Sequence, residues 1–144
     1  MKQNTFVIKQ ISVFSENKPG RLAAIAKALQ EEEINILAFS IAEADGFGVV
    51  RALVDKPQKA HEKLGGLGFN VAFTDVIAVR MKDEPGGLYD IARVLGEGKI
   101  NIEYAYAYSG KEAAVLILRV DNVDAAITAI RKGGGILLES SLFQ

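Results

Sequence analysis

The chain has 144 residues, of which 49% are hydrophobic and 24% charged, and its formal net charge at pH 7 is −1. This composition is typical of a globular chain that folds as one domain or as two small ones. The near-neutral charge gives no electrostatic reason to expect nucleic acid or an anionic membrane as a partner. With no cysteine and a single histidine, His61, the sequence excludes disulfides and a cysteine nucleophile and argues against a zinc site.

The opening segment, MKQNTFVIKQISVF, lacks the long apolar core and the small-residue cleavage site of a signal peptide. No apolar run in the sequence reaches the roughly 18 residues that a membrane-spanning helix needs. We therefore expect a cytoplasmic protein that has no membrane partner.

The first half of the chain switches repeatedly between the hydrophobic periods of strands and helices. Leu22, Ile25 and Leu29 recur at helical spacing behind Pro19, and proline suits the first position of a helix. A later pair of strand-like runs is separated by Ala-Asp-Gly, which predicts a hairpin. The predicted elements are strand Ile8–Phe14, helix Pro19–Glu32, strands Ile34–Glu43 and Phe47–Val54, helix Pro57–Leu64 and strand Phe69–Phe73.

The second half repeats the first. KPGRLAAIAKALQEEEINI and EPGGLYDIARVLGEGKINI align without a gap, 66 residues apart, and the same offset pairs Val54 and Asp55 with Val120 and Asp121. Two copies of one unit predict two domains, residues 1–73 and 74–144, with the boundary near Phe73 to Asp75. The predicted elements of the second copy are strands Val76–Met81, Ile100–Tyr108, Ala113–Val120 and Ile136–Leu142, with helices Pro85–Gly96 and Val123–Lys132.

Each copy therefore has the element order βαββαβ. This order predicts an α+β fold of two ferredoxin-like domains in tandem, in which two helices cover one face of an antiparallel sheet. Because many unrelated functions share this fold, the loops have to indicate the function.

The loop after the first predicted strand carries the motif SENKPGRL, and Ile34-Asn35-Ile36 follows twelve residues after it. The second copy carries KDEPGGL and then Ile100-Asn101-Ile102. On these motifs the chain resembles the ACT domain family, once in each half and over essentially its whole length. The sequence has neither the basic aromatic motif of an RNA-recognition module nor the Cys-x-x-Cys loop of a metal-transporting module.

In ACT proteins these loops lie where domains meet, and regulatory amino acids bind there to control metabolic enzymes. The resemblance therefore implies a non-catalytic, allosteric module that binds a small amino acid and has no cofactor, metal or catalytic residue. The ligand-binding residues expected from it are Asn17, Pro19, Gly20, Arg21, Leu22, Asn35 and Ile36 in the first copy, and Asp83, Pro85, Gly86, Gly87, Leu88, Asn101 and Ile102 in the second.

The chemistry of the loops agrees with such a ligand. Gly20 and Gly86 place backbone without a side chain at the start of a helix, where free amide N–H groups and the helix dipole can bind a carboxylate. Asn17 and Asn35 offer both donors and an acceptor to the ligand's ammonium and carboxylate groups. A purely structural interpretation stays open, in which Asn17 forms an Asx turn, the Pro-Gly pair starts a helix, and Asn35 caps a strand entry.

The two copies differ at the loop. Asn17, Lys18 and Arg21 of the first copy correspond to Asp83, Glu84 and Gly87 of the second. The acidic second loop would repel a carboxylate, so we expect Asp83 either to contact an ammonium group or to face water. Arg21 is either a counter-charge for the ligand or a solvated side chain at the helix start.

The strands predict association with other chains. Tyr104, Tyr106 and Tyr108 alternate with alanines, so one face of that strand presents three phenols, and the strand after Ile34 is apolar on both sides. Helices cover only one face of such a sheet, so the other should pack on another sheet. We therefore expect a homodimer or a higher oligomer.

The sequence can be compared with three classes of function. The sequence favours a regulatory binding module whose regulated enzyme or regulator is a separate chain. The alternative is a structural or regulatory subunit of an amino-acid biosynthetic enzyme complex that has no ligand of its own. An enzyme would need a nucleophile or a paired acid and base, and no such constellation is visible among the acidic residues, which fall mostly in turns, or at His61.

Overall fold

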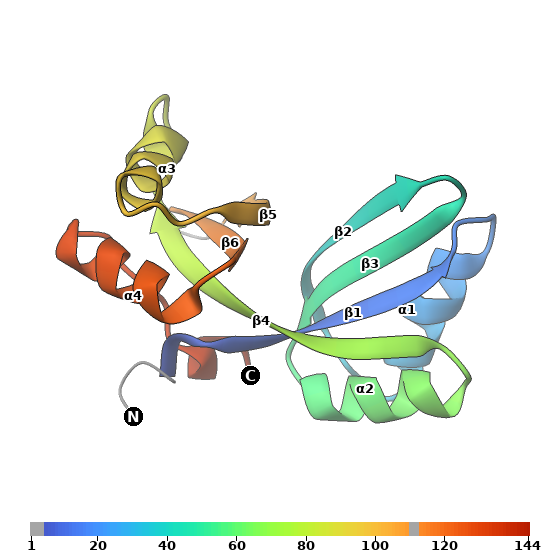
Figure 1. Cartoon of the computed structure of the whole chain (residues 1–144). Coiled ribbons are helices and arrows are strands. Elements are labelled where there is room, and N and C mark those ends of the chain that lie inside the picture. The colour runs from blue at the N-terminus through green and yellow to red at the C-terminus, as the bar shows by residue number, and fades with distance from the viewer. Residues whose placement is uncertain (1–4, 110–112) are drawn as a thin grey trace. The chain divides into compact units, whose positions relative to one another are not determined.

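The computed structural model describes residues 5–109 and 113–144, which divide into two compact units. The first unit consists of Lys9–Thr74 together with Phe143–Gln144. The second unit consists of the described residues up to Ile8 together with Asp75–Leu142. The division falls within one long strand, β4 (Asn70–Met81), which supplies its first part to one unit and its second part to the other (Figure 1).

The first unit has strands in the order β2-β3-β1-β4, with two helices on one face (Figure 1). Antiparallel pairing places Ile11 opposite Ala52 and Val13 opposite Val50, so these side chains share a face. They form a buried core with Leu29 and other residues of the two helices. The elements are β1 (Ile8–Glu16), α1 (Arg21–Glu31), β2 (Ile36–Ala44), β3 (Phe47–Val54), α2 (Pro57–Gly66) and the start of β4.

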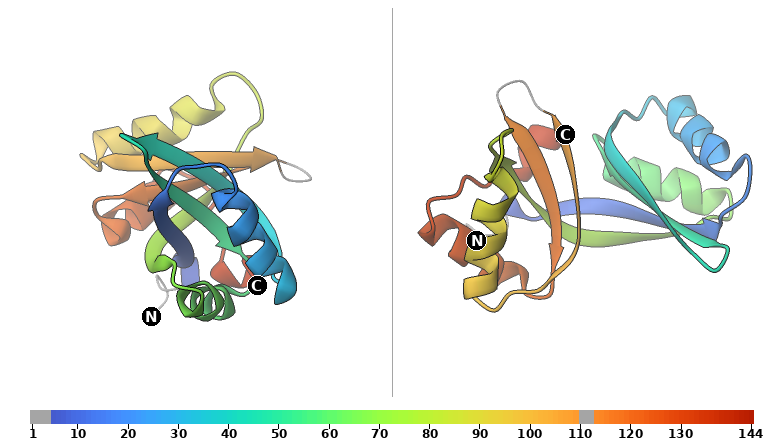
Figure 2. Two further views of the ribbon diagram at one scale, coloured as in Figure 1. Left: turned by 90° about the vertical axis from the view of Figure 1, so that its right-hand side faces the viewer. Right: turned by 90° about the horizontal axis from the view of Figure 1, so that it is seen from above.

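The second unit repeats this plan, and its helices lie on one side of β5 and β6 (Figure 2, right). Ile77 and Val79 of β4 pair with Leu118 and Leu116 of β6, and these four side chains face the helices in one core. On the opposite face Tyr104, Tyr106 and Tyr108 pair with alternate residues of β6, Arg119, Ile117 and Val115. The elements are the end of β4, α3 (Gly87–Glu97), β5 (Ile102–Ser109), β6 (Ala114–Val120) and α4 (Val123–Lys132).

The order βαββαβ and the covering of one sheet face by helices are confirmed, but both first helices begin later than predicted. Helix α1 starts at Arg21 rather than at Pro19, because Gly20 adopts a left-handed conformation with φ of 91°. Gly86, with φ of 93°, delays α3 in the same way, to Gly87. Pro19 and Pro85 therefore lie in the turns before the helices and not at the first helical position.

The two strands predicted at Phe69–Phe73 and Val76–Met81 are one continuous strand, β4. No glycine or proline lies between them, so nothing in the chain turns it there. The strand predicted at Ile136–Leu142 is wrong over most of its length. It is reduced to a single bridge between Leu137 and Val79, and a short 3-10 helix follows at Ser140–Phe143, where two serines interrupt the apolar run.

Candidate functional site

The loop that joins β1 to α1 in the first unit is held against the tip of the β2–β3 hairpin. The backbone N–H of Asn17 donates to the carbonyl of Gly46 at 2.8 Å, and the N–H of Arg21 donates to the carbonyl of Lys18 at 3.2 Å. Asn17, Pro19, Gly20, Arg21 and Leu22 are all exposed. Five of the residues predicted for the first copy's site are thus brought together on one fixed loop.

The N-terminus of α1 is open to an incoming group. Gly20 is the N-cap, and no side chain caps the helix among the described residues. The first helical bond of this turn runs from the N–H of Ala24 to the carbonyl of Gly20 at 3.0 Å. Of the amides ahead of Ala24, that of Arg21 donates to Lys18, and those of Leu22 and Ala23 have no capping side chain among the described residues, which is the geometry that receives carboxylates and phosphates.

Charges beside the loop already interact with each other. The ammonium of Lys18 lies 2.9 Å from a carboxylate oxygen of Glu16. The pKa of Glu16 is held below its ordinary value of 4.5, first by the hydrogen bond from Lys18 and then by the positive charge of Lys18, with a smaller effect from Arg21. Lys18 is therefore engaged, and Arg21 is the cation of this loop that has no ion pair among the described residues.

The corresponding loop of the second unit has the same turn in a tighter form. The N–H of Gly87 donates to the carbonyl of Glu84 at 3.0 Å, and the N–H of Asp90 donates to that of Gly86 at 3.1 Å. A Cβ atom on Gly87 would lie 2.1 Å from the carbonyl oxygen of Lys82. Only glycine fits there, which accounts for the replacement of Arg21 by Gly87 between the copies.

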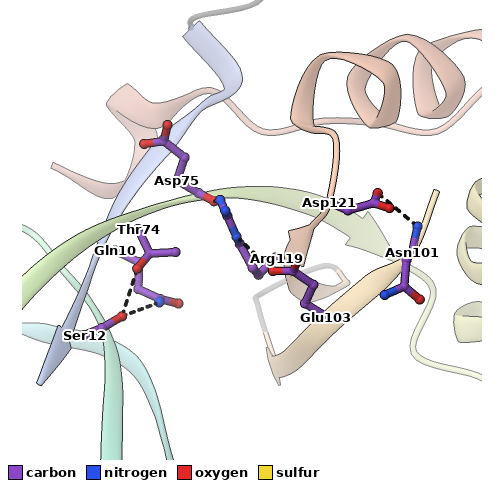
Figure 3. Close-up of polar contacts among 8 residues, drawn as sticks. All are labelled: Gln10, Ser12, Thr74, Asp75, Asn101, Glu103, Arg119 and Asp121. Atoms are coloured by element: carbon purple, nitrogen blue, oxygen red, sulfur yellow. Dashed lines mark hydrogen bonds and ion pairs between the residues drawn. The ribbon is translucent and has the colours of Figure 1, made fainter. Parts of the chain in front are cut away.

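Asn35 and Asn101 occupy equivalent places before β2 and β5. The N–H of Asn35 donates to Oδ1 of Asp55 at 2.9 Å, and the N–H of Asp55 donates back to the carbonyl of Asn35 at 3.1 Å. Asn101 and Asp121 form the same reciprocal pair, both at 3.1 Å (Figure 3). The backbone thus fixes both asparagines, while their exposed side-chain amides make no hydrogen bond to the residues that the structure describes.

Asn17 and Asn35 do not meet within one unit. Asn17 is bonded to Gly46, just before β3, and Asn35 to Asp55, just after β3. The eight residues of β3 separate these points by roughly 25 Å at the rise of an extended strand. A single amino acid therefore cannot bridge the two asparagines of one unit. Asn17 and Asn35 of the same unit do not contact one ligand together, contrary to our expectation.

The apolar residues predicted for the site divide into two kinds. Ile36 and Ile102 begin β2 and β5 and pack against the two cores, so their first role is structural. Leu22 and Leu88 are exposed at the helix starts, as are Asp83, Pro85 and Gly86 of the second loop. A ligand at either loop would find an apolar contact in these leucines.

Sequence reasoning missed a cavity inside the second unit. It measures about 390 Å³ and lies between α3, the end of β4 and the turn after α4. The signal that could have revealed it is the run Gly133–Gly135, which has Leu67, Gly68 and Phe69 as its counterpart in the first copy. Three consecutive glycines leave a wall without side chains.

The described residues hold no group of three acidic or histidine side chains suited to a metal ion. His61 stacks on Phe73, with 4.6 Å between ring centroids. None of the described helices is long and apolar enough to cross a membrane.

Comparison with known proteins identifies the family. Among solved structures, protein BT0572 from Bacteroides thetaiotaomicron is 36% identical, with 96% of each chain covered and a TM-score of 0.91. The ligand-free regulatory subunit of aspartate kinase from Thermus thermophilus is 17% identical, with 90% of this chain and 95% of that chain covered and a TM-score of 0.65. The regulatory subunit of aspartate kinase from Thermus flavus is 16% identical, with 88% of this chain and 92% of that chain covered and a TM-score of 0.58.

The two aspartate kinase subunits share the fold at low identity, and no curated protein matches the sequence significantly. The family described as "ACT domain pair" matches residues 6–135. With two βαββαβ units, a matching loop in each and this match over most of its length, the chain belongs to the ACT domain pair family.

Proposed function

We propose that this chain is a non-catalytic regulatory module that binds a small amino acid and passes the occupancy of that site to a separate metabolic enzyme or regulator. The observation that carries the proposal is the uncapped, glycine-started helix beside exposed polar side chains, present once in each unit of an ACT domain pair. The fold shared with two regulatory subunits of aspartate kinase supports a regulatory role.

The first loop suits the carboxylate of the ligand. Its uncapped amides lie at the positive end of the α1 dipole, and Arg21 adds a positive charge that no ion pair uses among the described residues. Asn17 offers an amide at the same loop. The second loop, with Asp83 in place of Asn17, suits the ammonium end of a ligand instead.

Asn35 acts in this proposal only across units. Because it lies at the far end of β3 from its own loop, it can contact a ligand only when that ligand is bound to the loop of a different unit. The same holds for Asn101, which is bonded to Asp121 just after β6. A ligand at the first loop could therefore also contact Asn35 when that asparagine comes from a second copy of the chain, as in the homodimer or higher oligomer that we expect.

A thermal-shift screen against the twenty amino acids tests the proposal, because a ligand that binds the folded state raises the melting temperature. We expect one amino acid, or a few related ones, to stabilise the wild type. Asn17→Ala should reduce that shift, whereas Gln58→Ala, which removes an exposed amide on α2, should leave it unchanged. No shift with any amino acid would count against ligand binding.

A second candidate function, a subunit that tightens an enzyme complex without its own ligand, is favoured by one observation. Phe39 and Ile41, alternate residues of β2 that share one face of the strand, are 49% and 43% exposed. Exposed apolar side chains of this size that lie next to each other on one strand face are typical of protein-binding surfaces. Stable co-elution with an amino-acid biosynthetic enzyme, in the absence of any amino-acid response, would select this alternative.

A further inference from the structure

The cavity of the second unit adjoins the second candidate loop, with which it shares Lys82 and Gly87, and is separate from the first loop. It is a half-open pocket bordered by α3, the end of β4 and the turn after α4, and its volume of about 390 Å³ falls in the range of small-molecule sites. We propose that this cavity binds a small aliphatic monocarboxylate, such as a branched amino acid or the corresponding 2-oxo acid.

The internal repeat explains why the cavity exists. In the first unit the N–H of Phe69 donates to the carbonyl of Leu64 at 3.1 Å, and the phenyl ring packs against the core. In the second unit the N–H of Gly135 donates to the carbonyl of Ile130 at 2.8 Å, at the same place in the repeat. The turn is kept while its aromatic side chain is missing, which leaves space lined by the residues around it.

The glycine wall is fitted closely to its neighbours. A Cβ atom on Gly133 would lie 3.0 Å from a methyl carbon of Val94, and one on Gly135 would lie 2.7 Å from Cγ2 of Ile130. These positions therefore favour glycine, and side chains at them would require Val94 or Ile130 to move. The turn after α4 is therefore closely packed against Val94 and Ile130, and the cavity beside it is not the result of a loosely packed turn.

The lining has the chemistry of an amphiphilic anion. Ile91, Val94 and Ile130 supply apolar surface, and Arg80 and Lys82 supply positive charge at the end of β4. Asp90, in the first turn of α3, lines the same cavity. A lining of apolar residues with a few charged ones suits an aliphatic carboxylate, and the single acidic residue adds a partner for an α-ammonium if the ligand has one.

The site is distinct from the proposed amino-acid site at the first loop. The cavity contains residues of the second unit alone, and Gly87 is the single residue that it shares with the predicted ligand-binding set. Asn17→Ala should therefore leave binding at the cavity unchanged, while a change in the cavity should leave the response of the first loop intact. The failure of one proposal is thereby separable from the failure of the other.

Isothermal titration of the full chain with L-leucine and with 4-methyl-2-oxopentanoate tests the inference. We expect at least one of the two probes to bind the wild type, and Lys82→Gln to weaken that binding about tenfold through the loss of one charge-assisted contact. Lys27→Gln removes the same charge from the exposed face of α1 and should leave the affinity unchanged. Tighter binding of leucine would support an ammonium contact at Asp90, and tighter binding of the oxo acid would support a ligand without that group.

A filled cavity gives the second test. Gly135→Phe combined with Ile130→Leu places in the second unit the pair that the first unit has at Phe69 and Leu64. This double variant should keep the circular dichroism spectrum of the wild type and lose the binding. Absence of binding of both probes to the wild type, or wild-type affinity in the folded double variant, would overturn the inference. If the double variant does not fold, equal affinities of Lys82→Gln and Lys27→Gln would overturn it.

Discussion

At the scale of single residues, glycine sets the geometry of both candidate loops. Gly20 and Gly86 have φ of 91° and 93°, a left-handed conformation that other residues rarely adopt, and each helix begins two residues after the preceding proline. Gly87 adds a close contact with the carbonyl of Lys82 that Arg21 cannot make. The second loop is therefore both more acidic and more tightly packed than the first.

Gly87→Ala tests this contact. The added methyl would overlap the Lys82 carbonyl, so we expect the free energy of unfolding to fall by about 1–3 kcal/mol, the usual cost of overpacking. Gly96→Ala, in the same helix and with open space around the new Cβ, should raise stability by about 0.5–1 kcal/mol instead. Urea denaturation of the three proteins measures both changes, and equal midpoints for the two variants would refute the close contact.

The pH dependence of Glu16 tests the charge arrangement beside the first loop. Because Lys18 lowers its pKa, the carboxylate should titrate below 4.5 in a carbon-detected NMR titration. The sign follows from linkage: the pair stabilises the fold above the unfolded pKa of Glu16, and this contribution is lost as the pH falls through the folded pKa. Lys18→Met should raise the pKa toward 4.5, and an unshifted value in both proteins would exclude the pair.

The sequence predicted which residues lie together on the first candidate loop, but not how far that loop lies from Asn35. The positions of Gly20 and Asn17 followed from a motif that repeats after 66 residues, because loop residues adjacent in sequence stay adjacent in space. The separation of Asn17 from Asn35 did not follow, since it depends on the length and direction of β3. The cavity also escaped prediction, because an absent side chain leaves no hydrophobic period to detect.

At the scale of elements, Arg119 joins three strands on the face of the second unit opposite the helices. Its Nη1 donates to the carbonyl of Asp75 in β4 at 2.8 Å, and its Nε donates to Glu103 in β5 at 3.3 Å (Figure 3). The register of β5 against β6 shifts between Ile102 and Tyr104, at Glu103. Arg119 therefore binds the carboxylate of Glu103 at the register shift in β5, which is the edge strand of the sheet.

Arg119→Met should lower the free energy of unfolding by about 1 kcal/mol, the typical net value of such hydrogen bonds at a partly exposed site. Arg93→Met removes the same charge from an exposed pair with Glu97 on α3 and should cost less, about 0.3–0.5 kcal/mol. Chemical denaturation compares the two, and a larger loss for Arg93→Met would contradict the role given to Arg119.

Elements were predictable from the sequence where the hydrophobic period was long. Helix Val123–Lys132 and strand Phe47–Val54 have the predicted bounds. The errors fall at Pro19 and Pro85, where a left-handed glycine overrides the helix-start preference of proline, and at Ile136–Leu142, where an apolar run predicts a strand and the structure has a single bridge and a 3-10 helix. Both errors arise from interactions that a local pattern does not contain.

At the scale of the whole molecule, the chain consists of two copies of one unit that have diverged where chemistry is expected. The cores and the reciprocal pairs of Asn35 with Asp55 and of Asn101 with Asp121 are equivalent in both copies. The loops and the turns at Phe69 and Gly135 are not equivalent. The two copies therefore keep one fold and differ at the candidate loops and at the turn after the last helix of each copy.

The measurement that tests the central claim most directly is an amide NMR titration of the full chain with the amino acid that raises the melting temperature. Binding at the loops predicts that the largest shifts occur at the amides of Gly20, Arg21 and Leu22, or at those of Gly86 to Leu88, and that Asn17→Ala reduces the shifts at the first loop. Saturable shifts confined to residues away from both loops would contradict the account, because the ligand would then bind elsewhere on the chain.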